Sequence, residues 1–133
     1  MKAKNTGFTF VELLIVVAIL AILAAIAHPF YTDYVMRTQR ADATTSLMQT
    51  WNHLERCFIE TLHYSECGHV VPEYSDQGFY RIEADLGSGQ FQLTARPAPG
   101  GPQEADEACQ EFTLNHHGHM DSSPGDRDTC WRT

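Results

Sequence analysis

Residues 7–27 read GFTFVELLIVVAILAILAAIA, and they form the most apolar stretch of the chain. The part from Phe8 to Ala27 holds 20 residues, the length that an α-helix needs to cross the hydrocarbon core of a bilayer. Within it only Thr9 and Glu12 carry polar side chains, and both lie near its start. The sequence therefore predicts a membrane-spanning helix with one carboxylate close to its N-terminal end.

The residues on either side of this helix predict its orientation. Lys2 and Lys4 are the only lysines of the chain, and they precede the helix. By the positive-inside rule they place the N-terminus in the cytoplasm and the C-terminal part on the outer side of the membrane. With 133 residues in total, the chain is long enough for one domain, and the part after the helix is near the lower size limit for an independent core.

The charges of the remaining chain argue against general nucleic-acid binding. The formal net charge is −8, and it becomes −10 without the first seven residues, because both lysines lie there and no acid does. The rest of the chain holds seven arginines against 17 acids. Binding to a phosphate backbone depends mainly on lysine and arginine, so DNA is not favoured as a partner.

Four cysteines follow the apolar stretch: Cys57, Cys67, Cys109 and Cys130. None of them forms a CxxC pair, and an even number in a small exported domain is typical of disulfide bonds formed in an oxidising compartment. The spacing therefore favours two disulfides over a zinc site. Four cysteines allow three pairings, of which proximity in the sequence favours Cys57 with Cys67.

A cleavable secretory signal peptide is the alternative interpretation of the N-terminus. Its support is the basic start, the apolar run and the small-x-small pattern of residues 25–27, which would give a mature chain that begins at His28. Against it stands Glu12, which lies where such a peptide is normally uncharged. The helical pattern also continues past residue 27.

Glu12 is the most informative residue of the stretch. A carboxylate in a membrane is costly and usually marks a function with a partner, yet no basic residue follows Glu12 before Arg37. Cleavage of the chain before Phe8 would create an α-amine there, and that amine and the positive end of the helix dipole would both attract the carboxylate. The amine belongs either to the same chain or to a neighbouring one.

The segment from Gly7 to Leu13 resembles the class III signal of type IV pilins and pseudopilins, in which a basic leader, a Gly-Phe pair, a threonine and a glutamate precede an apolar run. The resemblance implies cleavage between Gly7 and Phe8 by a prepilin peptidase on the cytoplasmic side, followed by N-methylation of Phe8. It also implies that Glu12 neutralises the N-terminus of a neighbouring subunit during assembly. Phe10 departs from the pattern, because leucine or isoleucine is commoner there.

The helix is expected to continue far beyond the apolar stretch, from about Phe8 to about Phe58, because no glycine lies between Gly7 and Gly68. Pro29 is the only proline in this interval and predicts a bend or local melting, since it cannot donate to the carbonyl four residues earlier. It also matches the helix-kinking proline of pilins. In the second half, one apolar stripe follows helical spacing and indicates a face packed on a sheet. Its members are Leu47, Trp51, Leu54 and Phe58.

The C-terminal part predicts a small antiparallel sheet. Residues 59–78 lack a clear period and indicate a loop, whereas residues 79–86 and 90–96 alternate like strands around a Gly-Ser-Gly hairpin signal. A third strand is expected at residues 110–115, and residues 116–133 are expected to be turn-like. The fold class is therefore α+β, with a long kinked helix on a small antiparallel sheet, which is the architecture of type IV pilins.

The C-terminal region resembles minor pilins of the PilE-like group, from the strand that begins near Cys109 to the pair Cys130-Trp131. In that group a cysteine pair closes the C-terminal region, which implies a bond between Cys109 and Cys130. The resemblance divides the chain into three parts. They are a leader at residues 1–7, a transmembrane and filament-core half of the helix at residues 8–28, and a periplasmic pilin domain at residues 29–133.

Two polar clusters near the C-terminus have the composition of metal sites. The histidines between His116 and His119 fall where a hairpin turn is expected, and no matching ligand spacing surrounds them, so a solvated turn is favoured. The acids between Asp121 and Asp128 do not match an EF-hand, so an ordinary acidic loop is favoured over a calcium site. The chain has no nucleophile elbow and no phosphate-binding loop, so the sequence predicts neither an enzyme nor a cofactor.

Together these features predict a structural subunit of a type IV pilus, and within that class a minor pilin. The resemblance implies that the inner membrane holds the chain before assembly and that a filament at the cell surface holds it afterwards. The implied partners are other pilin subunits, the prepilin peptidase and the pilus assembly platform, and the implied roles are twitching motility, adhesion or DNA uptake. Three alternatives remain: a type II secretion pseudopilin, a pilus-associated adhesin or DNA-binding module, and a secreted protein that has lost its first 27 residues.

Overall fold

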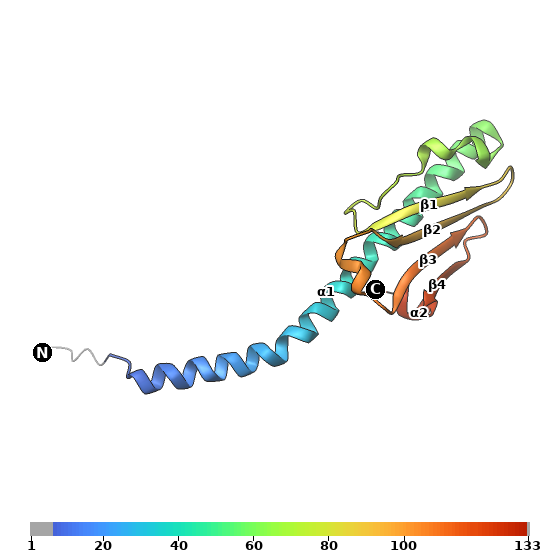
Figure 1. The fold of residues 1–133 in the computed structure, drawn as a ribbon. Coiled ribbons are helices and arrows are strands. Elements are labelled where there is room, and N and C mark those ends of the chain that lie inside the picture. Colours follow the sequence, from blue (N-terminus) through green and yellow to red (C-terminus); the bar gives the residue numbers. More distant parts are fainter. Residues whose placement is uncertain (1–6, 133) are drawn as a thin grey trace, which may run out of the picture. The chain divides into compact units, whose positions relative to one another are not determined.

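The computed structural model describes residues 7–132 of the chain (Figure 1). The chain divides into two compact units, Met1–Tyr34 and Val35–Thr133. Helix α1 (Phe10–Thr61) supplies the described secondary structure of the first unit and continues into the second, which also contains a four-stranded sheet.

Helix α1 is close to the helix predicted from the sequence. It ends at Thr61, and the following Leu62 has a left-handed φ of 61° and donates its N–H to the carbonyl of Phe58 at 2.8 Å. The local melting expected at Pro29 does not occur, because the helix runs through this residue without a break. A proline removes one backbone hydrogen bond, and the turns on either side still propagate so long a helix. The bend at Pro29 stays a prediction.

The sheet is an antiparallel meander in which strands adjacent in sequence are adjacent in space, in the order β1-β2-β3-β4. Strands β1 (Tyr80–Leu86), β2 (Phe91–Pro97) and β3 (Cys109–Asn115) confirm the three predicted strands to within one residue. The β1–β2 ladder closes at the pair Leu86 and Phe91, so its turn contains the predicted hairpin signal.

The prediction for residues 116–133 is wrong in part, because a fourth strand, β4 (Met120–Pro124), and a short helix, α2 (Arg127–Cys130), follow the turn. The sequence of β4, MDSSP, lacks the β-branched and aromatic residues and the apolar alternation that mark strands. It forms a strand because β3 offers it a backbone edge to pair with, and an edge strand tolerates a proline.

One face of α1 and the inner face of the sheet form the core of the second unit (Figure 1). Leu47 and Leu54 of the predicted stripe are fully buried, and Trp51 and Phe58 are partly buried beside them. The inward residues of the strands join the same cluster, among them Tyr80, Ile82, Phe91, Leu93, Phe112 and Leu114. This burial confirms the α+β class with one helix packed on a small antiparallel sheet.

Candidate functional site: the exposed segment of the N-terminal helix

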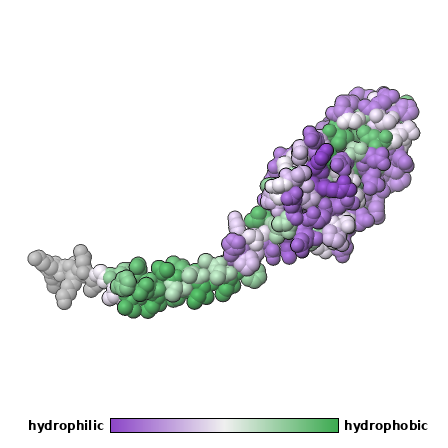
Figure 2. All heavy atoms as spheres, viewed as in Figure 1, coloured by the Kyte–Doolittle hydropathy of each residue, from purple (hydrophilic) through white to green (hydrophobic). Residues whose placement is uncertain are grey.

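Every described residue from Gly7 to Tyr34 is exposed, although most of these side chains are apolar (Figure 2). The exposed fractions of the large hydrophobic side chains run from 44% at Val16 to 80% at Phe8. A window of 18 residues is long and apolar enough to cross a membrane, and none of it is buried. Soluble proteins rarely leave so large an apolar surface uncovered, so lipid or the apolar helices of other molecules have to cover this segment.

Glu12 takes part in a capping box at the start of α1. Its backbone N–H donates to Oγ1 of Thr9 at 3.2 Å, and its Oε2 accepts the N–H of Thr9 at 3.4 Å. This reciprocal pair satisfies two of the free donors at a helix N-terminus. The spacing Thr-x-x-Glu is a sequence signal for such a cap, and the prediction above did not use it. Glu12 therefore has a local partner besides the amine predicted for it.

Gly7 directly precedes the predicted cleavage site, and the described fold does not require a glycine there. A Cβ atom at Gly7 would meet no described atom within 4 Å. Packing among residues 7–132 therefore does not exclude a side chain at this position. The rest of the predicted leader, including Lys2 and Lys4, lies outside the described residues.

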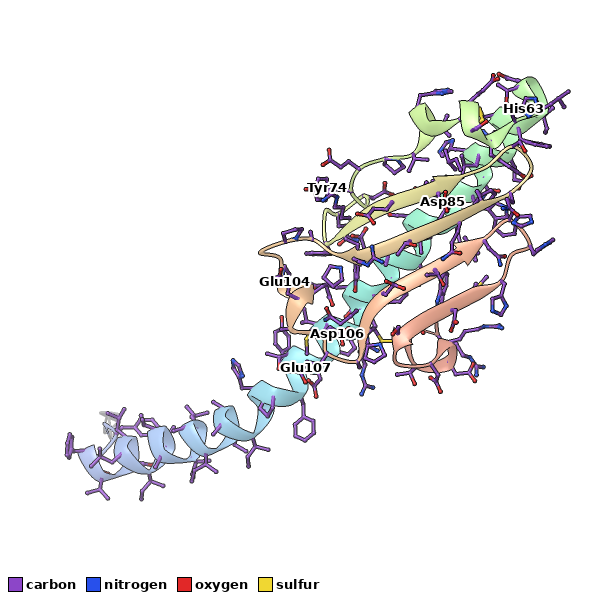
Figure 3. The ribbon with its side chains drawn as sticks, turned by 45° about the vertical axis from the view of Figure 1, so that its right-hand side comes forward. His63, Tyr74, Asp85, Glu104, Asp106 and Glu107 are labelled. Carbon is purple, nitrogen blue, oxygen red and sulfur yellow. A yellow bond between two sulfur atoms is a disulfide. The ribbon has the colours of Figure 1, made fainter. Side chains whose placement is uncertain are left out.

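A buried ion pair ties α1 to the C-terminal half of the second unit. Arg40 donates from Nε and Nη2 to the two carboxylate oxygens of Asp106, at 2.6 and 2.8 Å, and from Nη1 to the carbonyl of Thr129 at 3.2 Å. Asp106 lies beside α1, just after the 3-10 turn η3 (Pro102–Ala105) (Figure 3). The hydrogen bond to Asp106 raises the pKa of Arg40, so the guanidinium stays charged despite its burial.

Asp42 anchors the loop before β1 to the same helix. Its carboxylate accepts the hydroxyl proton of Ser75 and the backbone N–H groups of Gln77 and Phe79, the latter two at 3.0 and 3.3 Å. Burial raises the pKa of the neighbouring Tyr80, whose phenol stays neutral. None of these contacts was predicted, because the partners of Asp42 lie 33 to 37 residues away and no local pattern signals them.

Two disulfide bonds hold the ends of the second unit, and they join the predicted pairs. Cys57 bonds to Cys67 across the end of α1, with a Cα–Cα distance of 6.0 Å, and Cys109 of β3 bonds to Cys130 of α2, with a distance of 5.7 Å. Both distances are usual for disulfides. The loop that the first bond closes contains the 3-10 turn η1 (Tyr64–Glu66), and a second 3-10 turn, η2 (Gly68–Val70), follows directly after Cys67. The bonds close both ends of a domain that is small for an independent core.

The polar clusters near the C-terminus have structural partners. Residues 116–119 lie on the β3–β4 turn, as predicted, and the rings of His116 and His117 lie with centroids 3.9 Å apart and planes tilted by 40°. In the acidic loop, Asp126 caps α2 by accepting the N–H of Thr129 at 2.8 Å, and this hydrogen bond lowers the pKa of Asp126. Among the residues that the structure describes, no three His, Cys, Asp or Glu side chains lie close enough together to hold a metal ion.

Carboxylates also engage arginine on the outer face of the sheet. Arg96 donates to Glu83 at 2.8 Å and to Glu111 at 2.6 and 2.9 Å. Arg40 is buried against Asp106, and the exposed Arg81 and Arg132 lie 4.0 and 3.8 Å from Glu83 and Asp128, so four of the seven arginines have a carboxylate beside them. This reduces the positive charge that a phosphate backbone would meet at the second unit.

Known proteins share both parts of this arrangement. Residues 29–113 match the family model described as type IV minor pilin ComP, DNA uptake sequence receptor, and residues 2–27 match the prokaryotic N-terminal methylation motif. The chain is 35% identical over 105 residues to the type IV major pilin protein PilA of Myxococcus xanthus, which covers 74% of this chain and 48% of that protein. It is 36% identical over 104 residues to a fimbrial protein of Pseudomonas aeruginosa, which covers 78% of this chain and 67% of that protein. The chain thus spans about half to two thirds of the length of these relatives.

A solved structure has the same fold. The crystal structure of the non-core minor pilin PilV of Neisseria meningitidis superposes with a TM-score of 0.59 at 19% identity. The match covers 73% of this chain and 94% of that one. The likeness confirms the predicted architecture of a long N-terminal helix on an antiparallel sheet.

Proposed function

Because the chain belongs to the type IV pilin family, we propose that it is a subunit of a pilus filament, and within the filament a minor one. The inner membrane holds it before assembly, with the domain of residues 29–133 in the periplasm. The exposed apolar segment of α1 carries this proposal, because it needs lipid around it at one stage and other apolar helices around it at the next. The methylation motif at residues 2–27 supports a prepilin peptidase as the enzyme that prepares the chain.

Cleavage between Gly7 and Phe8 would place the new N-terminus two residues before the first residue of α1. The exposed Phe8 then carries an α-amine, which the same enzyme N-methylates. Thr9 and Glu12 still form their capping box, because neither of its bonds involves residues 1–7. The mature chain thus begins with a positive charge close to a carboxylate that the cap holds in place.

The Glu12 carboxylate is the docking point at this end of the helix. Within the described structure its only bond is the 3.4 Å contact with the N–H of Thr9, so it retains the capacity to accept a stronger, charge-assisted bond. In a filament of parallel, staggered helices, the Phe8 amine of an incoming subunit reaches Glu12 of a subunit already in place. The pair sets the stagger between subunits. We assign the pair no net contribution to the stability of the filament, because the cost of removing two charges from water offsets their attraction.

DNA binding is a second candidate function, favoured by the family model whose description names a DNA uptake sequence receptor. The charge of the chain opposes it, because no lysine follows Lys4 and carboxylates hold Arg40 and Arg96. Retardation of labelled duplex DNA by the full chain, at about 0.15 M salt, separates the two candidates. Sequence-selective retardation at micromolar protein would favour the receptor, and no retardation would favour a purely structural subunit.

Glu12→Gln tests the assembly proposal with the start of the helix kept intact, because glutamine also completes a capping box. The variant should be cleaved, inserted and disulfide-bonded like the wild type. Its amount in sheared filaments should nevertheless fall about tenfold or more, because the Phe8 amine of the incoming subunit would be left among apolar helices without a carboxylate, at a cost of at least about 1.4 kcal/mol. If the wild type initiates filaments, the number of filaments should fall instead.

Thr9→Ala is the matched control for this experiment. It removes the cap, at a cost of about 1 kcal/mol, but keeps the charge of Glu12, so its incorporation should stay close to the wild-type level. Wild-type incorporation of Glu12→Gln would show that the charge is dispensable. An equal loss in both variants would show that the cap, and not the charge, governs assembly.

A further inference from the structure

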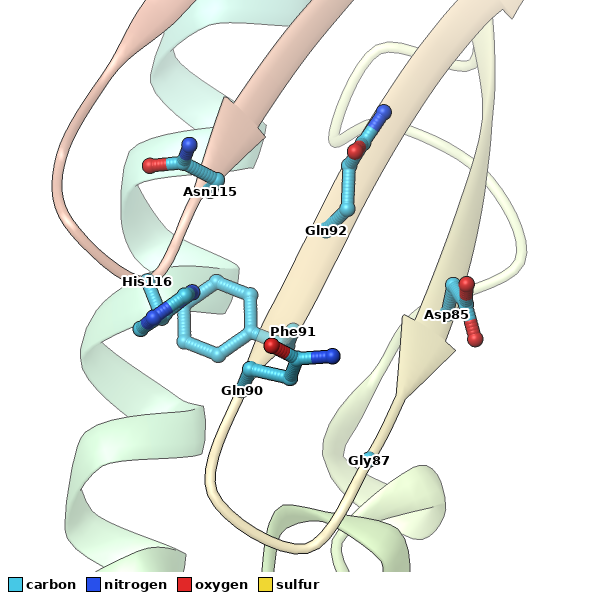
Figure 4. A pocket seen from close by; sticks show the side chains of 7 residues that line it. All are labelled: Asp85, Gly87, Gln90, Phe91, Gln92, Asn115 and His116. Carbon is cyan, nitrogen blue, oxygen red and sulfur yellow. The ribbon is translucent and has the colours of Figure 1, made fainter.

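A hollow of about 240 Å³ lies at one end of the sheet, where β1 ends, β2 begins and β3 ends (Figure 4). Its lining consists mainly of polar side chains: one carboxylate, three carboxamides and one imidazole, with the ring of Phe91 beside them. All of these residues belong to the second unit. The hollow lies far along the chain from the assembly segment, and nothing in the proposed subunit function uses it.

Three of the polar side chains form a row that the sheet itself holds in place. The ladders pair Asp85 of β1 with Gln92 of β2, and Gln92 with Asn115 of β3. Residues paired across strands point to the same face, and adjacent strands lie about 4.8 Å apart. Figure 4 shows the three side chains one per strand across this end of the sheet. Their spacing is therefore fixed by backbone hydrogen bonds before any ligand arrives.

This row offers both free hydrogen-bond donors and free hydrogen-bond acceptors. Oδ1 of Asn115 accepts the backbone N–H groups of His117 and His119, both at 3.0 Å, which leaves Nδ2 to donate elsewhere. In the described part of the chain, the side chains of Asp85, Gln90 and Gln92 make no hydrogen bond. The hollow thus offers a carboxylate that accepts, amides that donate and accept, and one amide whose orientation is set.

The walls of the hollow are also shaped by specific contacts. A Cβ atom at Gly87 would lie 3.2 Å from Cγ and 3.3 Å from the carbonyl oxygen of Gln90, so a side chain there would displace Gln90. On the other side, the ring of His116 lies edge-on to Phe91, with centroids 6.2 Å apart, and its backbone N–H donates to the carbonyl of Phe91 at 3.1 Å. The lack of a side chain at Gly87 thus lets Gln90 take its present place in the wall of the hollow.

We propose that this hollow binds one sugar residue of a neutral glycan. Neighbouring hydroxyls of a sugar each donate and accept a hydrogen bond, which matches a row of one carboxylate and two carboxamides. An anionic ligand is disfavoured, because Asp85 would repel it and no arginine or lysine lines the hollow. One carboxylate is too few for a calcium ion, and the polar lining does not suit an apolar ligand. The volume of about 240 Å³ is below that of pockets for drug-sized ligands, so the hollow suits a single small ring better than a longer ligand.

Saturation-transfer NMR on the full chain tests this proposal, with the protein in a detergent that has no sugar head group. The probes are the methyl glycosides of glucose, galactose, mannose and N-acetylglucosamine, with N-acetylneuraminic acid as the anionic comparison. At least one neutral glycoside should receive saturation and bind with a Kd of about 1 mM or tighter, whereas the anion should not. Free oligosaccharides from the bacterium's own envelope and from mucin, used as competitors, identify the natural source; displacement by either supports the proposal.

Exposed side chains allow variants that leave the fold unchanged. Gln92→Ala and Asp85→Ala should each weaken sugar binding about fivefold or more, because each removes a hydrogen-bonding partner. Gly87→Ala should weaken it through the displaced Gln90. The matched controls are Gln77→Ala and Asp76→Ala, exposed side chains of the loop before β1, which should bind like the wild type.

Three results would overturn the proposal. The first is that no neutral glycoside at about 10 mM receives saturation from the protein. The second is sugar binding that survives both Gln92→Ala and Asp85→Ala, and the third is a preference for the anionic sugar. A near-ultraviolet circular dichroism spectrum identical to that of the wild type ensures that a lost signal in a variant is not lost folding. None of these results bears on filament incorporation, so the subunit function stands or falls separately.

Discussion

Replacing Asp106 with alanine should destabilise the second unit by about 3–5 kcal/mol, because it leaves a buried guanidinium without its partner. Arg40 and Asp106 have side chains that are only 8% and 3% exposed, and two hydrogen bonds of 2.6 and 2.8 Å join them. In the variant, Arg40 keeps only its bond to the carbonyl of Thr129. The raised pKa of Arg40 follows from its bond to Asp106, and an arginine does not lose its proton in water even without such a bond. The variant therefore cannot relieve the cost by becoming neutral.

Urea unfolding of the full chain in detergent micelles measures this loss. The chain has two tryptophans, Trp51 and Trp131, and both lie in the second unit, so their fluorescence reports on the unfolding of that unit. With a slope of about 2 kcal/mol per molar urea, the midpoint should fall by about 1.5–2.5 M. Glu83→Ala is the control, because it removes an exposed partner of Arg96 and should cost less than about 1 kcal/mol.

The double variant Arg40→Met/Asp106→Leu separates the loss of the pair from the cost of the orphaned charge. It should be more stable than Asp106→Ala, because apolar residues of similar volume often replace a buried ion pair without loss. A midpoint for Asp106→Ala equal to that of Glu83→Ala would refute the reasoning. So would a double variant that is as unstable as the single one.

Two further predictions concern the second unit. Peptide mapping without reduction should recover the pairs Cys57–Cys67 and Cys109–Cys130. The double variant Cys57→Ser/Cys67→Ser should lose about 3 kcal/mol of unfolding free energy in urea. Four free thiols in protein from the periplasm would contradict both the pairing and the stability loss. Burial and a hydrogen bond to Glu55 raise the pKa of Tyr64 from 10.0 to about 12, so the stability that its neutral phenol contributes is full below pH 10 and is lost as the pH rises through 12. Ultraviolet titration should show two late-ionising phenols, Tyr64 and the buried Tyr80, and Tyr64→Phe should remove amplitude near pH 12. Loss of amplitude near pH 10 instead would show that Tyr64 ionises normally.

The elements with a strong local pattern were predictable from the sequence. Leu47 and Leu54 recur at helical spacing in a segment without glycine, and strand β2 alternates Phe91, Leu93 and Ala95 inward. Strand β4 carries no such pattern, because its pairing with β3 and not its composition makes it a strand. At Pro29 only the expected local melting is wrong, since one missing hydrogen bond does not melt a helix that is 52 residues long.

The candidate site was predictable where its residues are close in sequence. The order Gly7, Phe8, Glu12 ahead of an apolar run is a local motif, and so is the capping box that was overlooked. The ion pair of Arg40 with Asp106 joins residues 66 apart, which no window of sequence contains. The row of Asp85, Gln92 and Asn115 likewise depends on the register of two ladders, which becomes known only from the folded sheet.

The mass of the chain recovered from sheared surface filaments tests the central claim most directly. The account predicts that the filaments contain this chain, in smaller amount than the dominant subunit, with the mass of residues 8–133 plus one methyl group and two disulfide bonds. The absence of the chain from purified filaments would contradict the account. A mature chain that begins at His28 would contradict it too, because cleavage there removes the whole apolar segment on which assembly depends.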